Sequence, residues 1–144
     1  MTLVCGPPAA GKSRYVAEQA GATNIIIDLD EIVRELGIKP RGGSWWDRRR
    51  AIEERNRRLQ ALANESAAGA AWFITTAPTG MSRERWARLL RAKRVLLFLT
   101  PREISLARID ADADRRAERE TQVAILDRWW RFYYPSRVDT VMEV

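Results

Sequence analysis

The chain has 144 residues and a formal net charge of +6, with 46% hydrophobic and 31% charged residues. No apolar stretch is long enough to cross a bilayer, so the sequence predicts one globular domain over 1–144 and no membrane segment. The single cysteine, Cys5, excludes an internal disulfide, and the absence of histidine excludes imidazole catalysis and the usual zinc sites.

The excess of positive charge has two open interpretations. It suits a phosphate-rich partner such as a nucleotide or nucleic acid. However, only Lys12, Lys39 and Lys93 are lysines, and an arginine-rich composition can also arise from biased codon usage without any binding role. The first strand begins too early for a signal peptide to precede it, so we expect a cytoplasmic location.

Five short apolar runs predict strands: Thr2–Cys5, Asn24–Asp28, Ala71–Thr76, Val95–Thr100 and Val138–Val144. Several are unbroken runs of Ile, Val, Leu and Phe, which is typical of parallel strands with helices on both faces. Helical patterns lie between them, as in βαβ units. The sequence therefore predicts a three-layer α/β domain with a five-stranded parallel sheet.

Local signals predict where the helices begin and end. One helix begins near Gly11. Ser44 with Asp47 opens a second helix that runs to about Ala67. Ser82 caps a third, from Arg83 to about Ala92, and Pro101 is the first residue of a fourth. The last helix, about 119–134, ends before Pro135. Residues 108–119 carry alternating charges and predict an exposed, mobile segment.

Residues 6–13, GPPAAGKS, match GxxxxGK[ST] between a strand and a helix, which is the context that this phosphate-binding motif requires. Gly6 and Gly11 allow the backbone to curve closely around phosphate. Lys12 can bridge the β- and γ-phosphates, and the Ser13 hydroxyl can ligate Mg²⁺. We therefore predict a site for ATP and Mg²⁺ formed by Gly6, Ala9, Ala10, Gly11, Lys12, Ser13 and Arg14.

Two acids follow the second strand in IIIDLDEIVREL, at Asp28 and Asp30. Placed two apart on one strand face, they can divide the work: Asp28 assists the metal and Asp30 orients an acceptor hydroxyl and takes its proton. Arg34, one helical turn further, can bind an anionic group of the acceptor. The alternatives are that Asp30 only caps the next helix and that Arg34 lies in solvent.

The chain resembles the small P-loop kinases, which include polynucleotide, zeta-toxin-like, shikimate and gluconate kinases. The resemblance rests on the phosphate motif near residue 1, on IDLDEIVREL, on the arginines of residues 108–119 and on YYPS near the end. It implies a sheet of order 2-3-1-4-5 and a contact of Asp30 with the acceptor hydroxyl. It also implies a lid over about 108–119, whose Arg108, Arg115 and Arg116 contact the nucleotide and the transferring phosphate.

The chain departs from the polynucleotide kinases at the end of the third strand. Those kinases usually carry an aspartate there, and the matching residue here is Thr76. A hydroxyl is a weaker partner for a magnesium site than a carboxylate. Asp28 is the candidate to supply the missing charge. Without it, the protein would bind ATP and turn it over slowly.

The lid arginines also have a mechanistic rationale, because a guanidinium on a closing segment stabilises the charge on a transferring phosphoryl group. Arg108 belongs to the preceding helix, which suits a contact with the adenine or the α-phosphate. Arg115 and Arg116 are the candidates for the reacting phosphate. The alternative is that both pair with the acids at 110, 112 and 114 on a solvated surface.

Residues 38–58 occupy the place where such kinases bind their acceptor. Arg41, Trp45, Trp46 and the arginines at 48–50 combine stacking faces with phosphate contacts, which suits single-stranded nucleic acid or a nucleotide. The alternative is that the start of the helix packs one tryptophan into a core and that the rest forms a solvated face. For Trp129 and Trp130, near the end of the last helix, a core or dimer contact is the simpler interpretation.

The leading hypothesis is an ATP- and Mg²⁺-dependent kinase that phosphorylates a hydroxyl, with a nucleic-acid 5′-hydroxyl as the acceptor. One rival is a nucleotide-binding module or slow ATPase that acts in nucleic-acid handling. Another is a kinase for a mononucleotide or small metabolite.

Overall fold

The computed structural model describes residues 1–38, 44–63 and 71–143, and within them five strands form one parallel sheet. The order is β2-β3-β1-β4-β5, as the resemblance implied. The strands are β1 (Thr2–Cys5), β2 (Ile25–Asp28), β3 (Ala71–Thr75), β4 (Arg94–Phe98) and β5 (Asp139–Met142). The predicted fold class is confirmed, and each predicted strand is present with ends that differ by a few residues at most.

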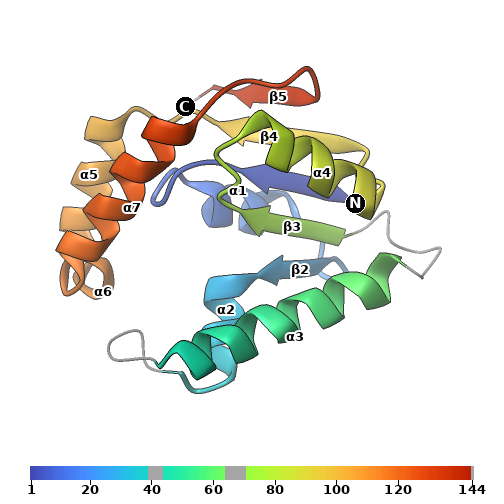
Figure 1. Ribbon diagram of the computed structural model, residues 1–144, viewed down its shortest axis with the longest axis horizontal. Coiled ribbons are helices and arrows are strands. Elements are labelled where there is room, and N and C mark those ends of the chain that lie inside the picture. Colours follow the sequence, from blue (N-terminus) through green and yellow to red (C-terminus); the bar gives the residue numbers. More distant parts are fainter. Residues whose placement is uncertain (39–43, 64–70, 144) are drawn as a thin grey trace.

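The helices connect the strands and cover the sheet (Figure 1). They are α1 (Lys12–Gln19), α2 (Leu29–Glu35), α3 (Trp45–Ala63), α4 (Gly80–Leu90), α5 (Arg102–Ala111), α6 (Ala113–Arg116) and α7 (Arg119–Phe132). In Figure 1, α5, α6 and α7 stand together beside the edge at which the strands end. Among the described residues, no helix has the length and apolar character needed to cross a membrane.

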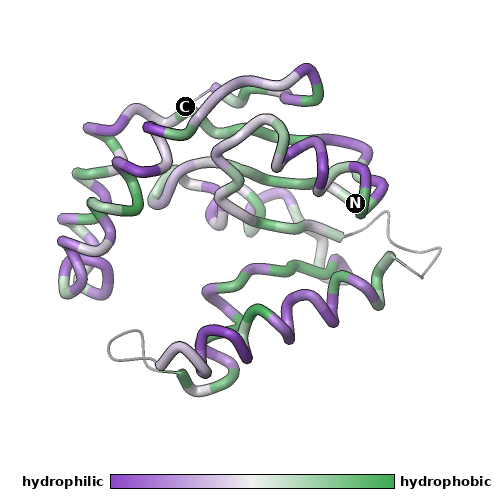
Figure 2. Tube along the Cα trace, in the orientation of Figure 1, coloured by the Kyte–Doolittle hydropathy of each residue, from purple (hydrophilic) through white to green (hydrophobic). Residues whose placement is uncertain are grey.

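The buried core lies on both faces of the sheet because successive residues of a strand point to opposite faces. Leu3 and Cys5 of β1 pack into a cluster with side chains of α2, α3, α4 and α7. Val4 packs into a second cluster with Val16 of α1. Figure 2 shows hydrophobic central strands and helices along which hydrophilic and hydrophobic positions alternate.

Two predicted helix starts were wrong by a few residues. Helix α4 begins at Gly80, since the Thr79 hydroxyl caps it by accepting from the backbone N–H of Ser82. Ser82 therefore lies in the first turn. Helix α5 begins at Arg102, with Pro101 in the cap position in an extended conformation. The Thr100 hydroxyl donates to the carbonyl of Ala10 and does not cap the helix.

The segment 108–119 was predicted to be exposed and mobile, but it is largely helical. Helix α5 continues to Ala111, and Asp112 caps the short α6 by accepting from the N–H of Asp114. The local hydrogen bond of an aspartate side chain gives the polar sequence a regular turn that the charge pattern does not reveal. The predicted exposure holds, since most of these residues are exposed.

The predicted start of α3 is confirmed in detail. The Ser44 hydroxyl accepts from the N–H of Asp47, and the Asp47 carboxylate accepts from the N–H of Ser44. This reciprocal pair fixes the first turn of the helix. Helix α3 is described to Ala63, and the rest of the predicted span, to about 67, lies outside the described residues.

Candidate nucleotide and phosphoryl-transfer site

The phosphate loop, residues 6–13, joins β1 to α1 at the edge where the strands end. Gly6 has φ 155°, and a Cβ there would lie 2.7 Å from the carbonyl oxygen of Phe98, so only glycine fits. Ala9 (φ 56°) and Gly11 (φ 95°) adopt left-handed conformations, which turn the chain sharply. The close backbone approach that the sequence predicted is therefore present.

The phosphate loop presents a row of free backbone donors. Within the described chain, no acceptor bonds the N–H groups of residues 9–13, whereas the carbonyls of Ala9 and Ala10 accept from Arg108 and Thr100. The positive end of α1 begins at the same residues. Successive unpaired N–H groups at a helix N-terminus form an anion-binding site, and a phosphate is the group that fits this loop.

Lys12 is buried, with 9% of its surface exposed, and its Nζ donates to the carbonyls of Gly6 at 2.8 Å and Pro7 at 2.6 Å. Burial lowers the pKa of Lys12 to about 8. The charges of Asp28 and Asp30 oppose this shift, and that of Arg115 adds to it. The lysine is thus held on the phosphate loop, within the electrostatic reach of both acids and one lid arginine.

Ser13 and Asp28 are brought together as predicted. The Ser13 hydroxyl donates to one carboxylate oxygen of Asp28 at 3.1 Å, and the other accepts from the N–H of Asp30 at 3.1 Å. Burial, followed by the charge of Asp30, raises the pKa of Asp28. Hydroxyl and carboxylate oxygens are ligands that Mg²⁺ prefers, and it usually takes few of them from protein. Ser13 and Asp28 therefore fit a magnesium site.

Asp30 differs from its prediction in one respect, because the strand ends at Asp28. Asp28 caps α2, and Asp30 is an exposed residue of the first helical turn. The helix-cap role therefore belongs to Asp28, and no described residue forms a hydrogen bond or ion pair with the Asp30 carboxylate. Arg34 is 66% exposed and pairs with Glu31 at 3.1 Å, as in the solvated alternative.

The lid arginines lie at different distances from the phosphate loop. Arg108 donates to the carbonyl oxygen of Ala9 at 3.2 Å and lies against Gly11. Arg115 donates to Gln122 at 3.2 Å and lies 3.6 Å from the Asp112 carboxylate, so it is partly engaged within the lid. Arg116 is exposed, and no described residue forms an ion pair with it.

At the end of β3, Thr76 supports the site through its backbone carbonyl. Its carbonyl oxygen accepts from the N–H of Gly6 at 3.3 Å and from Nε1 of Trp129 at 2.7 Å, while its side chain is exposed. The carboxylate beside Ser13 comes instead from Asp28 on β2. Trp129 is 2% exposed, which agrees with the core interpretation of this residue.

Sequence reasoning missed two residues that support the site. The Thr100 hydroxyl, fully buried after β4, donates to the carbonyl of Ala10 at 2.8 Å. Arg83, also fully buried, binds Asp139 through two hydrogen bonds and donates to the carbonyls of Ala77 and Pro78. Both contacts join distant parts of the chain, so no local pattern signals them.

The remaining predicted residues lie away from the phosphate loop or outside the description. Arg14 is exposed on α1 and pairs with Glu18 at 3.1 Å. Trp45 and Trp46 are 62% and 71% exposed at the start of α3, so the interpretation of core packing was wrong for both. Arg41 lies outside the described residues.

The parallel sheet, its strand order and the phosphate loop define the P-loop kinase fold. Residues 1–135 match the model of the family AAA_33, described as "AAA domain". The chain belongs to this P-loop kinase-like family, and the predicted kinase resemblance is confirmed. Membership supports a nucleotide-dependent phosphotransferase.

No curated protein matches the chain. Among solved structures, a shikimate kinase from Acinetobacter baumannii in complex with shikimate matches with a TM-score of 0.47 and 19% sequence identity. The match covers 99% of this chain and 82% of that one.

Proposed function

We propose that the chain transfers the γ-phosphate of ATP to a hydroxyl in a Mg²⁺-dependent reaction, and that the acceptor is a nucleic-acid 5′-hydroxyl. The observation that carries the proposal is the 3.1 Å contact between Ser13 and Asp28, next to a loop of unpaired N–H groups. This arrangement joins a phosphate site to an oxygen pair suited to a metal.

The phosphate half of the site works through the backbone and Lys12. The free N–H groups of residues 9–13 bind phosphate oxygens, and Lys12 adds its charge once it leaves the carbonyls of Gly6 and Pro7. Ser13 and Asp28 hold Mg²⁺, which, when bound, neutralises charge on the phosphate oxygens. Arg108, already on the loop through Ala9, contacts the nucleotide.

Asp30 acts as the base in the transfer. Its carboxylate takes the proton of the acceptor hydroxyl as that oxygen bonds to the γ-phosphorus, and the bond from phosphorus to the bridging oxygen breaks to release ADP. The exposed carboxylate of Asp30, which no described residue pairs with, supports this role. Arg115 and Arg116 stabilise the charge on the phosphoryl group when the lid closes over it.

The proposed acceptor binds between α2 and α3. Arg34 and Arg41 contribute positive charge, and Trp45 and Trp46 contribute stacking faces. The exposure of both tryptophans supports this assignment. For Arg34, it requires that the guanidinium exchange Glu31 for the acceptor, which is feasible because an exposed ion pair contributes little stability.

The test is transfer of label from γ-labelled ATP to a 5′-hydroxyl oligonucleotide, with ATP binding measured in parallel by calorimetry. Replacing Asp30 by Ala should spare ATP binding and reduce transfer by about 10²- to 10⁴-fold. Glu31→Ala is the matched control, since it removes the adjacent acid of the same helix, and it should retain transfer. Unchanged transfer in Asp30→Ala would remove Asp30 from the mechanism.

The rival hypothesis, a nucleotide-binding module or slow ATPase, is favoured by one observation: Thr76 offers no carboxylate at the end of β3. In that case nucleic acid would stimulate ATP hydrolysis, and no labelled nucleic acid would form. A mononucleotide or small-metabolite kinase would instead release ADP in response to one compound of an acceptor panel. These three outcomes, measured on one purified protein, therefore distinguish the three hypotheses.

A further inference from the structure

The first turn of α3 carries an aromatic surface that is not part of the buried core. Trp45 and Trp46 are 62% and 71% exposed, and their rings meet edge to face with centroids 4.7 Å apart. The residues that α3 buries against the sheet come later, at Ala51, Leu59 and Leu62. Leaving two large apolar rings in water costs free energy of hydration, which a bound partner would recover.

Arginines surround this pair. The Arg49 guanidinium lies over the ring of Trp45, 5.2 Å from its centroid, and also pairs with Glu53 at 3.0 Å. Trp46 lines an open hollow together with Arg49, Arg50 and Glu53. The side chain of Arg48 is exposed and forms no hydrogen bond or ion pair with any described residue, so its charge is available to a ligand. We call these residues, 45–50, the tryptophan–arginine platform.

The platform is held in place before any ligand arrives. The reciprocal Ser44–Asp47 pair fixes the start of α3, and Arg50 donates to the carbonyl of Leu36 at the end of α2 at 3.1 Å. A fixed surface loses less conformational entropy on binding than a mobile one. The aromatic faces are therefore preorganised.

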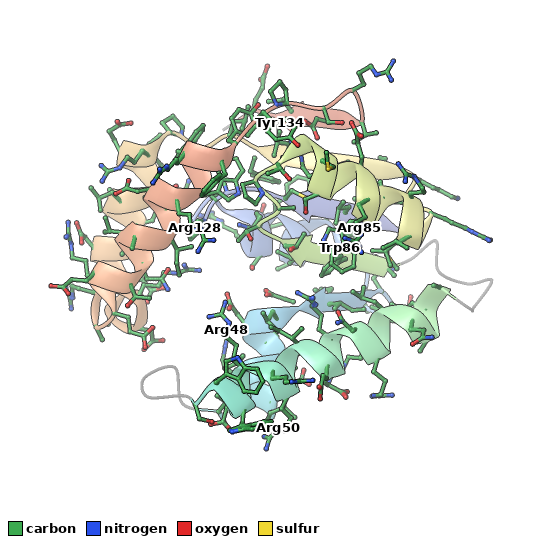
Figure 3. The ribbon with its side chains drawn as sticks, in the orientation of Figure 1. Arg48, Arg50, Arg85, Trp86, Arg128 and Tyr134 are labelled. Atoms are coloured by element: carbon green, nitrogen blue, oxygen red, sulfur yellow. The ribbon has the colours of Figure 1, made fainter. Side chains whose placement is uncertain are left out.

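The platform lies on the side of the molecule where the strands end. In Figure 1 the start of α3 and helices α5 to α7 lie on opposite sides of that edge. In Figure 3 Arg48 extends from α3 toward the side that carries α7, and Arg128 lies on the side of α7 that faces it. A ligand on the platform is thus on the same side as the phosphate loop.

We infer that the platform binds single-stranded nucleic acid, with unpaired bases stacked on Trp45 and Trp46 and the backbone phosphates bound by Arg48. Aromatic faces with neighbouring guanidinium groups match the two repeated features of such a strand, which are π-faces and negative charges. In a duplex the base faces stack on one another, so only groove edges, sugars and phosphates are exposed. This inference rests on the proposed function, because it names how the acceptor of that reaction is recognised.

Binding is tested without nucleotide, on the full chain, by fluorescence anisotropy. The probes are an oligothymidine of about 12 nucleotides with a free 5′-hydroxyl and a blunt hairpin duplex of equal charge. We expect the single strand to bind more tightly than the hairpin. Replacing both tryptophans by leucine should weaken single-strand binding at least about tenfold, whereas phenylalanine at both positions should stay within about threefold.

Two controls separate the effect of lost stacking from the effects of lost charge and of lost stability. Arg88→Ala removes an exposed arginine of α4 and should leave binding unchanged, whereas Arg48→Ala should weaken it. The melting temperatures of the leucine variants should match that of the original chain, because both side chains are exposed. The inference is overturned if the hairpin binds as tightly, if leucine binds as well as tryptophan, or if the single strand does not bind.

Light scattering tests the competing occupant, a second copy of the chain. If the leucine variants convert a dimer to a monomer and leave oligonucleotide binding unaltered, the platform is a dimer interface and the inference is wrong. The proposed function fails separately. Transfer that depends on Asp30 but not on the tryptophans would support the proposed kinase activity and contradict the platform inference. Single-strand binding that depends on the tryptophans, without any transfer, would support the platform inference and contradict the proposed kinase activity.

Discussion

Two loops leave neighbouring strands at the same edge of the sheet, and they differ in what completes their hydrogen bonds. The phosphate loop follows β1, and the β3 loop, residues 76–79, follows β3, with Cys5 and Thr75 paired across the two strands. Each loop holds an alanine at positive φ, Ala9 at 56° and Ala77 at 33°. The sharp turn is therefore common to both, and the hydrogen bonding is not.

The carbonyls of both loops accept hydrogen bonds, and the loops differ in how the next helix begins. The N–H groups of residues 9–13 form an unpaired row at the start of α1, where no side chain caps the helix, whereas the Thr79 hydroxyl caps α4 by accepting from the N–H of Ser82. The carbonyl of Thr76 accepts from Gly6 and Trp129, and those of Ala77 and Pro78 accept from Arg83. A buried polar group without a partner costs free energy, so unpaired groups persist where a ligand completes them. The comparison indicates a binding loop and a supporting loop.

The largest expected effect comes from breaking the binding loop at Lys12. Lys12→Ala removes the phosphate loop's own side-chain charge, and we expect ATP affinity and phosphoryl transfer each to fall at least about 10²-fold. Calorimetry measures the first and label transfer the second. Lys93→Ala, at an exposed lysine before β4, is the control and should bind ATP normally. Retained affinity in Lys12→Ala would refute the phosphate-loop assignment.

The supporting loop depends on Arg83 for its stability. Its guanidinium is fully buried and binds Asp139 at 2.7 and 2.8 Å as well as the loop carbonyls. Arg83→Ala leaves a buried carboxylate and several carbonyls unpaired, so we expect a loss of about 3–5 kcal/mol in the free energy of unfolding. Urea denaturation measures it. Arg85→Ala, two residues further along α4 and exposed, should change stability by less than about 0.5 kcal/mol.

The binding loop also makes a prediction about pH. The pKa of Lys12 in the free protein is lowered to about 8, so the lysine is protonated below pH 8 and loses its charge above it. Phosphate binding favours the charged form. ATP affinity should therefore be constant below pH 8 and fall by up to about tenfold per unit above it. Lys12→Arg should bind with no such fall, because arginine stays protonated. A flat profile for the unaltered chain would contradict the prediction.

These two loops also show what the sequence could predict. The phosphate loop was predictable because it is local: eight consecutive residues carry the glycines, the lysine and the serine. The alternation of apolar runs predicted the five strands for the same reason. The resemblance, rather than the runs themselves, supplied the strand order.

The β3 loop was not predictable because its contacts are distant in sequence. Arg83 binds Asp139, Trp129 donates to the carbonyl of Thr76, and Arg83 is the most deeply buried charged residue described. The exposure of the two tryptophans at the start of α3 was not predictable for a different reason. An aromatic pair has the same sequence signature whether it packs in the core or faces water, and only the structure shows that Trp45 and Trp46 are exposed.

The smallest expected effect tests whether a carboxylate at the end of β3 can replace that of Asp28 at the end of β2. Thr76 contributes its carbonyl to the supporting loop, and its exposed side chain leaves room for a carboxylate. Thr76→Asp alone should lower the Mg²⁺ concentration required for activity by no more than about tenfold, since Asp28 already lies beside Ser13. Asp28→Asn should raise that requirement by about 10- to 100-fold. In the double variant, restored Mg²⁺ dependence would mean that either strand can supply the charge. Failure to restore it would mean that Asp28 is needed for its position, where one oxygen faces Ser13 and the other caps α2.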